Sequence, residues 1–331
     1  MRRVLKAVLW LALGALLLLA AFATVQYHRA PSLEPYRSLT LAPADNTAPG
    51  TVRVRFGGVA TLVFDDGETA WMTDGFFSRP GVLATVATRI GPDPQRIDDA
   101  LQKMGVTRLA AVVPVHSHYD HAMDSPVVAQ RTGAKLIGSV STMRIGRGLG
   151  LPPAQMQLVQ SGEQVRLGKF TLRFIASRHS PTPYSDGHSV ELIETDLVPP
   201  QRVFAWREGT VWSIHVAHDG GGTWLVQGSA GFVPGALAGL RADTVFLGTG
   251  TLGKKSEAYR AQFWNETVSA VGAKRVVPIH WDNFWLALDE PLQAMPLLLD
   301  DFALTMQDLQ ARGQQGGVQV HMPPLFVPFT P

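Results

Sequence analysis

The sequence predicts one large domain of the α/β class over residues 51–331, and two observations support this prediction. About 280 residues are enough to bury a full hydrophobic core within one domain. Within this region, short apolar runs rich in β-branched residues, typical of strands, alternate with stretches of helical periodicity. No convincing internal repeat divides the segment further.

The first predicted strand covers residues 51–56, where apolar and charged side chains alternate as in a half-buried strand. Strands at 60–64 and 69–73 follow, joined by a hairpin turn at 65–67. Asp93, followed by a proline, is predicted to begin a helix. The later predicted elements are strands at 109–113, 135–139, 170–175, 211–216, 223–226, 243–247, 275–281 and 318–320, and helices capped by Asp124 and at 257–271 and 298–309.

The first 25 residues differ in composition from the rest of the chain. Arg2, Arg3 and Lys6 precede an apolar segment at 7–25, which is long enough for a membrane span of about 20 residues. The same segment fits a long signal peptide, because residues 21–23 form a small-residue cleavage site. The basic flank stays in the cytoplasm, so the body is expected to be periplasmic or anchored outside the inner membrane.

Composition indicates a linker before the domain and limits the kinds of partner and covalent bond that the chain is expected to have. Residues 26–50, rich in Pro, Ala and Ser, are predicted to be a linker or wrapping arm. The net charge is +2, and without the three basic residues before Ala7 the chain has 26 basic and 27 acidic side chains. No basic patch stands out, so no nucleic-acid partner is expected. The absence of cysteine excludes disulfides, thiolate ligands and a lipidated cysteine anchor. The oligomeric state is not predicted.

Four metal-capable side chains lie within six residues, directly after the apolar strand at 109–113. His116, His118 and Asp120 alternate along the chain, so an extended chain end points all three to one side. His121 turns the other way where the chain leaves the strand. Neutral imidazole and carboxylate together suit Zn²⁺, so the stretch is predicted to be a metal site.

The His-x-His-x-Asp-His pattern resembles that of the metallo-β-lactamase-fold metal-dependent hydrolases. The resemblance implies a four-layer αββα sandwich with two zinc ions at one edge, between the sheets. It implies that His116, His118 and His179 hold the first zinc and that Asp120, His121 and His280 hold the second. The Pro-Ile-His-Trp sequence at 278–281 is similar to the last-ligand signature of the N-acyl phosphatidylethanolamine phospholipase D-like and lactonase-like branch.

Ser229 departs from this pattern, because many family members carry a bridging aspartate there. A serine hydroxyl supplies no negative charge to the metals. The resemblance therefore implies one tightly held zinc and a weaker second zinc site.

Other residues near the predicted site have weaker signals. Asp74 ends a strand and is predicted either to support a metal ligand or to cap a turn, and the turn cap is favoured. Three aromatic residues follow His280, namely Trp281, Phe284 and Trp285, and they are predicted to be either core residues or an apolar wall for substrate. His188 is a candidate substrate contact. His215 and His218 are predicted to lie outside the metal set.

The segment 248–256 resembles a phosphate-binding P-loop only in part. Gly248, Gly253 and Lys254 match the motif, but Lys255 occupies the position that requires a Ser or Thr hydroxyl. The segment is therefore predicted to be a glycine loop close to the metals.

The resulting functional hypothesis is a zinc hydrolase in which a metal-bound hydroxide attacks an ester, lactone, amide or phosphodiester. Asp120 is the predicted catalytic residue, orienting the nucleophile and moving its proton. Two alternatives stay open. One is a lipid phosphodiesterase of the N-acyl phosphatidylethanolamine phospholipase D type, with the site presented to lipid by the N-terminal segment. The other is a non-catalytic metal-binding module. A small molecule or a lipid is thus the expected substrate.

Overall fold

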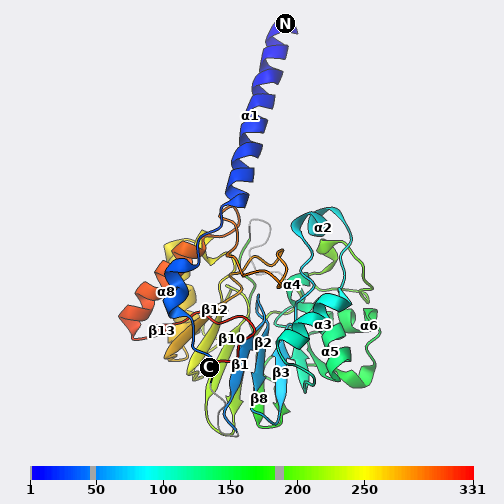
Figure 1. Ribbon diagram of the computed structural model, residues 1–331, viewed down its shortest axis with the longest axis vertical. Helices are drawn as coiled ribbons and strands as arrows, with labels where there is room; N and C mark the ends of the chain where they lie inside the picture. The colour runs from blue at the N-terminus through cyan, green and yellow to red at the C-terminus, as the bar shows by residue number, and fades with distance from the viewer. Residues whose placement is uncertain (1, 45–49, 183–189) are drawn as a thin grey trace.

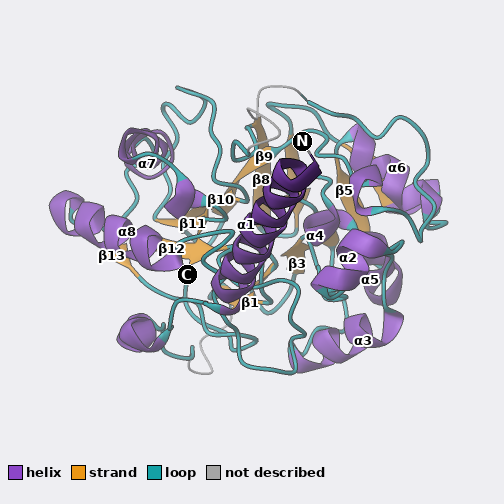
Figure 2. Cartoon of the chain, turned by 90° about the horizontal axis from the view of Figure 1, so that it is seen from above, coloured by secondary structure: helices purple, strands orange, loops and turns teal. Residues whose placement is uncertain are grey.

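Two β-sheets lie face to face, with helices on the outer side of each (Figures 1 and 2). The computed structural model describes residues 2–44, 50–182 and 190–331. In spatial order, the first sheet contains β1 (Arg53–Phe56), β2 (Leu62–Asp65), β3 (Ala70–Thr73), β4 (Ala111–Val113), β5 (Lys135–Gly138) and β6 (Met156–Leu158). The second contains β13 (Gln319–Val320), β12 (Arg275–Ile279), β11 (Thr244–Gly248), β10 (Thr223–Gln227), β9 (Trp212–His218), β8 (Phe170–Ala176) and β7 (Gln164–Leu167).

The helices form the two outer layers. α3 (Pro94–Lys103), α5 (Ser125–Thr132) and α6 (Val140–Gly148) cover the first sheet, and α7 (Glu257–Trp264) and α8 (Phe302–Gly316) cover the second (Figure 2). The remaining helical segments are short: η1 (Glu34–Leu39), α2 (Val82–Ala87), α4 (Tyr119–Ala122), η2 (Pro153–Gln155), η3 (Val203–Ala205), η4 (Leu252–Lys254) and the π-helical η5 (Asn265–Ser269). The predicted αββα sandwich is therefore present.

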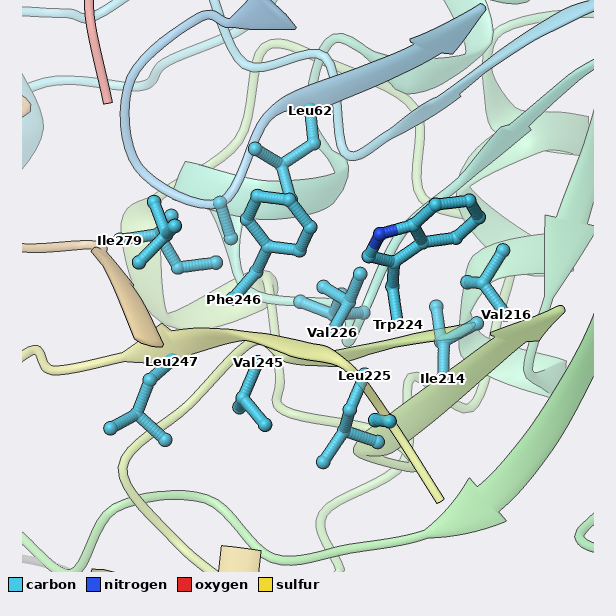
Figure 3. Close-up of a cluster of buried hydrophobic side chains, with 14 of the residues drawn as sticks. Leu62, Ile214, Val216, Trp224, Leu225, Val226, Val245, Phe246, Leu247 and Ile279 are labelled. Carbon is cyan, nitrogen blue, oxygen red and sulfur yellow. The ribbon is translucent and has the colours of Figure 1, made fainter. Parts of the chain in front are cut away.

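Both faces of the second sheet are buried. Phe246 and Val226 point from β11 and β10 toward Leu62 of the first sheet, whereas Val245 and Leu247 point to the opposite face (Figure 3). Alternate residues of a strand project to opposite faces, so one run of apolar residues fills two interfaces. This explains why these strands appear in the sequence as continuous apolar runs.

Parallel strands bring the chemically important loops to one edge. β3, β4, β5 and β6 are mutually parallel, as are β10, β11, β12 and β13. β8 runs parallel to β10, because each is antiparallel to β9 between them. Loops that follow the carboxyl ends of parallel strands meet at the same end of a sheet. We call this end the metal edge.

Local signals explain α3 and correct the prediction for α5. The Asp93 carboxylate accepts hydrogen bonds from the backbone N–H groups of Gln95 and Arg96, and this caps α3 as predicted. Asp124 precedes α5, but its side chain makes no cap. It instead accepts hydrogen bonds from the backbone N–H groups of Phe77 and Ser78, on another segment. Hydrogen bonds to a distant segment thus take the place of the predicted helix cap at Asp124.

Several elements were not predicted or have different bounds. α6 carries Gly146 and Gly148 in its last turn, and these weaken the helical pattern although Ser139 caps the helix. The helix predicted at 257–271 changes to a π-helical turn after Trp264. α8 begins at Phe302, capped by Asp301, so the start predicted at residue 298 is wrong.

The chain before the domain has two parts. α1 (Arg2–His28) is a single apolar helix, long enough to cross a membrane, and its most apolar 18-residue window is not buried within the described part of the protein. Part of the predicted linker then packs on the domain. The ring of Tyr36 lies 5.4 Å from that of Phe302, and Thr40 forms a β-bridge with Met322. This segment is a wrapping arm rather than a free linker.

Candidate metal centre

The six predicted ligands meet at the metal edge, on loops that follow β4, β8 and β12. They form two groups of three, and within each group the ligand atoms lie within 4.8 Å of one another. The first group is His116, His118 and His179, and the second is Asp120, His121 and His280. Segments separated by up to about half the chain therefore supply one compact set of donors.

The first group presents ring nitrogens that converge. His116 Nε2 lies 3.1 Å from His118 Nδ1. His179 Nδ1–H donates to the Ser180 carbonyl oxygen at 2.9 Å, which leaves its Nε2 free to bind a metal. Burial lowers the pKa of His118 to about 4 and that of His179 to about 3. These rings are neutral at pH 7, as metal ligands must be.

The second group adds a carboxylate. His121 Nε2 lies 3.1 Å from His280 Nε2, and Asp120 Oδ2 lies 3.4 Å from His280 Nε2. Burial alone raises the pKa of Asp120, but His121 and His280 outweigh burial and hold the pKa well below its usual range. Asp120 is thus ionised. Imidazole nitrogens and one carboxylate oxygen converging at these distances fit a divalent ion such as zinc.

Asp74 supports the second group from behind. Its Oδ2 accepts a hydrogen bond from His121 Nδ1 at 2.7 Å, and its Oδ1 accepts one from the Val115 backbone N–H at 2.8 Å. The favoured interpretation of Asp74 as a turn cap is therefore wrong. A carboxylate on the far nitrogen of a histidine fixes its tautomer and directs the other nitrogen toward the metal.

Asp74→Asn is expected to weaken metal binding about 10- to 100-fold, because the amide is a poorer acceptor for the His121 N–H. Calorimetric titration of the apoprotein with Zn²⁺ measures the change. Asp66→Asn is the matched control. Asp66 lies in the turn that precedes β3, and its Oδ2 is 3.0 Å from His218 Nε2, so it is also a carboxylate paired with a histidine. Equal losses in both variants would contradict the assigned role of Asp74.

Ser229 lies beyond β10 and lines the same cavity as the ligands. Its hydroxyl oxygen accepts a hydrogen bond from the Ser180 backbone N–H at 2.9 Å. Ser180 directly follows His179, so Ser229 holds the loop that carries this ligand. This contact had no signal in the sequence.

Ser229→Asp is expected to raise the metal affinity of the Asp120–His121–His280 site, because it adds a negative charge where the sequence pattern places a bridging ligand. Stepwise calorimetric titration should resolve one tight and one weaker site in the wild type and a smaller difference in the variant. Ser229→Asn controls for side-chain size. Two equally tight sites, unchanged by the substitution, would show that Ser229 does not occupy the bridging position.

A cavity of about 650 Å³ opens onto both groups. Its apolar wall includes Phe204, Phe284, Trp285, Met295 and Leu298, and its cations are Arg207, Lys254 and Lys255. Of the three aromatic residues predicted as core or wall, Trp281 is buried in the core, with its ring 5.2 Å from that of Phe302. The other two, Phe284 and Trp285, line the cavity.

The glycine loop after β11 also borders the cavity, as predicted. Asp300 accepts hydrogen bonds from the backbone N–H groups of Thr251 and Gly253 at 2.9 and 3.1 Å. A Cβ atom on Gly253 would lie 2.0 Å from the Asp301 carbonyl oxygen. Two backbone N–H groups that a P-loop would direct at a phosphate are therefore bonded to Asp300, and Gly253 is packed against protein backbone.

Three further histidines were considered in the sequence analysis, and one of them, His188, is outside the described residues. His215 contacts the Arg241 carbonyl oxygen at 2.7 Å, and His218 pairs with Asp66. Neither has a ligand atom in the two groups, in agreement with the prediction.

An unpredicted clamp lies beneath His280. Asp282 accepts hydrogen bonds from Arg79 Nη2 at 2.5 Å and from the Val59 backbone N–H at 2.8 Å, and both charged side chains are fully buried. The His280 backbone N–H in turn donates to the Val59 carbonyl oxygen at 2.6 Å.

Unusual backbone geometry gathers around this clamp. The described chain has six non-glycine residues with positive φ, and Val59, Asp74, Arg79, Thr251 and His280 are five of them. Such strain persists only where the surroundings enforce it, and it clusters at functional sites.

Sequence comparison finds relatives that are named metal-dependent hydrolases. No protein-family model matches the sequence. A UPF0173 metal-dependent hydrolase from Myxococcus xanthus is 26% identical over 45% of this chain, and one from Chloroflexus aurantiacus is 25% identical over 55%. This chain spans 47% of the length of the first relative, about half, and 68% of the second.

Two solved structures align with most of this chain. A possible metal-dependent hydrolase from Veillonella parvula aligns with a TM-score of 0.50 and 14% identity, covering 85% of this chain and 99% of that one. The metallo-β-lactamase fold protein YhfI from Bacillus subtilis gives 0.45 and 13%, covering 84% and 96%. The predicted likeness to metal-dependent hydrolases is confirmed by the two relatives, and the Veillonella parvula structure shares the fold. The narrower likeness to the N-acyl phosphatidylethanolamine phospholipase D-like and lactonase-like branch stays a prediction.

Proposed function

We propose that this chain, which has the metallo-β-lactamase fold, is a zinc-dependent hydrolase with a two-metal centre formed by the six ligands above. The observation that supports this most strongly is the convergence of five imidazole rings and one ionised carboxylate on one cavity. A packing role would not require so many buried, mutually facing ring nitrogens.

When bound, a divalent ion at this centre lowers the pKa of water and polarises the substrate oxygen under attack. Asp120 would then orient the attacking water and accept its proton, since its carboxylate is ionised and lines the cavity. His121 is held in one tautomer by Asp74, and His179 by the Ser180 carbonyl. Fixed orientations of this kind place donors before substrate arrives.

The lining of the cavity favours the binding of substrates that combine an apolar group with a hydrolysable ester, lactone, amide or phosphodiester. Phe204, Phe284 and Trp285 offer contact to an acyl or aryl group, whereas Lys254 and Lys255 offer charge to an anionic group. The second candidate, a lipid phosphodiesterase, is favoured by this same pairing of apolar wall and cations.

The test combines metal content with a substrate screen. We expect elemental analysis of the purified protein to find zinc or another divalent transition metal, and a chelator to abolish turnover. Zn²⁺, Mn²⁺ and Fe²⁺ are then restored separately, with ester, lactone, amide and phosphodiester substrates. Asp120→Asn controls for contaminating activity. Metal without turnover on any substrate would favour the non-catalytic module, and absence of metal would contradict the whole proposal.

We also propose that α1 keeps the domain outside the cytoplasm as a membrane anchor. Its apolar run is longer than the 7–15 residues typical of a signal-peptide core. Mass spectrometry of the mature N-terminus should find residues 7–25 retained. Cleavage after Ala23 would instead identify a signal peptide, and a full-length soluble protein in the cytoplasm would contradict export.

A further inference from the structure

α1 leaves the domain directly beside the cavity. The Arg29 carbonyl oxygen, one residue beyond the helix, accepts a hydrogen bond from the Leu297 backbone N–H at 2.8 Å. Leu298 and Leu299 line the cavity. In Figure 1, α1 projects from the end of the molecule that carries α2 and α4. A membrane span of about 20 residues ending near residue 25 would therefore hold the cavity mouth at the bilayer surface.

Apolar side chains are exposed around this mouth. Leu83 and Val86 of α2, Phe204 of η3 and Leu298 are 77%, 62%, 87% and 46% exposed, and we call these four residues the apolar rim. Phe204 and Leu298 also line the cavity. Three chain segments contribute to the rim, which favours a shared surface over a single frayed loop. Gathered exposed apolar groups of this kind mark interaction sites.

The segments of the rim are connected to one another. Arg202 Nη1, next to η3, donates to the Ala87 carbonyl oxygen at the end of α2 at 2.8 Å. Within α2, Thr85 is the buried residue, so Leu83 and Val86 point away from the domain. The rim is thus a fixed part of the folded surface.

Exposed cations lie among the rim segments. Arg29 follows α1, Arg202 adjoins α2, and Lys254 lines the cavity. Apolar side chains interleaved with Arg and Lys suit the boundary between acyl chains and anionic headgroups. A soluble protein partner would not explain why these groups surround the root of an apolar helix.

We propose that the apolar rim inserts into a lipid bilayer and that the cavity receives an amphiphilic substrate from it, an acyl-bearing ester, amide or phosphodiester. The substrate part of this inference rests on the proposed hydrolase function. The bilayer contact does not, because it follows from α1 and the rim alone.

The lack of cysteine makes the contact measurable on the full chain. Leu83→Cys, Phe204→Cys and Leu298→Cys are each labelled with a nitroxide and reconstituted in vesicles of phosphatidylcholine and phosphatidylglycerol. Glu68→Cys is the control. Glu68 is exposed and lies in the turn before β3, whereas Asp74 and the metal edge lie at the other end of this strand. Paramagnetic resonance compares collision with oxygen, which is enriched in lipid, and with a water-soluble nickel chelate.

We expect the three rim labels to collide mainly with oxygen and the label at residue 68 to collide mainly with nickel. Rim labels as accessible to nickel as the control would overturn the bilayer contact. A second variant, Leu83→Ser with Val86→Ser, should lower the ratio of turnover on vesicle-borne substrate to turnover on a short-chain soluble ester by about tenfold. An unchanged ratio would overturn delivery from the bilayer. Loss of all hydrolysis in the wild type would refute the hydrolase function but not the label result.

Discussion

His116→Ala is expected to abolish hydrolysis and to remove the metal held with His118 and His179. His116 is fully buried, and its Nε2 faces His118 Nδ1 at 3.1 Å, so alanine deletes one of the three imidazoles of this group. A catalytic ion contributes several kcal/mol to transition-state stabilisation, and kcat/KM should therefore fall at least about 1,000-fold. Elemental analysis and kinetics at saturating zinc measure both effects.

His215→Ala is the matched control for this substitution. His215 lies on β9 and contacts a backbone carbonyl oxygen rather than another ligand, so its loss should leave metal content intact. Circular dichroism verifies that both variants are folded. Wild-type turnover by a folded His116→Ala protein would rule out the His116–His118–His179 site as the catalytic one.

The donors of the first motif were predictable because they are local. His116, His118, Asp120 and His121 lie within six residues, so their closeness along the chain already brings the four donors together. The extended chain predicted to point His116, His118 and Asp120 to one side is wrong, because β4 ends at Val113 and Asp120 and His121 lie on α4. His179 and His280 needed the family resemblance, because a single histidine after a strand has no distinguishing pattern. The strands themselves were visible as apolar runs buried on both faces, as Phe246 and Val245 illustrate in Figure 3.

The sequence left the role of Asp74 open and gave no signal for Arg79 or Asp282, because the partners of these residues are far away in the sequence. Asp74 and His121 are 47 residues apart, and Arg79 and Asp282 are 203 apart. Nothing within either segment distinguishes such a residue from a turn aspartate or a surface arginine. The aromatic residues after His280 show the same limit, since the sequence did not separate Trp281, which packs in the core, from Phe284 and Trp285, which line the cavity.

Arg79→Ala is expected to destabilise the protein by about 3–5 kcal/mol, because it leaves the carboxylate of Asp282 buried without its cation. Both side chains are fully inaccessible to solvent, and Gly58 leaves the space that the guanidinium fills. Urea denaturation of the chelator-treated protein measures the free energy of unfolding without a contribution from metal binding. Arg131→Ala is the control, because the exposed Arg131–Asp98 pair should contribute only about 0–1 kcal/mol.

The same substitution should also weaken the second metal site, and this distinguishes a positioning role from a purely structural one. Asp282 holds Val59, Val59 accepts the backbone hydrogen bond of His280, and both Val59 and His280 have positive φ. Without the clamp, the backbone of His280 is no longer held at positive φ. The Asp120–His121–His280 site should therefore lose metal affinity, while the metal affinity of the His116–His118–His179 site should stay unchanged. Calorimetric titration of Arg79→Ala under conditions where it is folded tests this directly. Loss of stability with unchanged affinity at both sites would show that the clamp supports the fold alone.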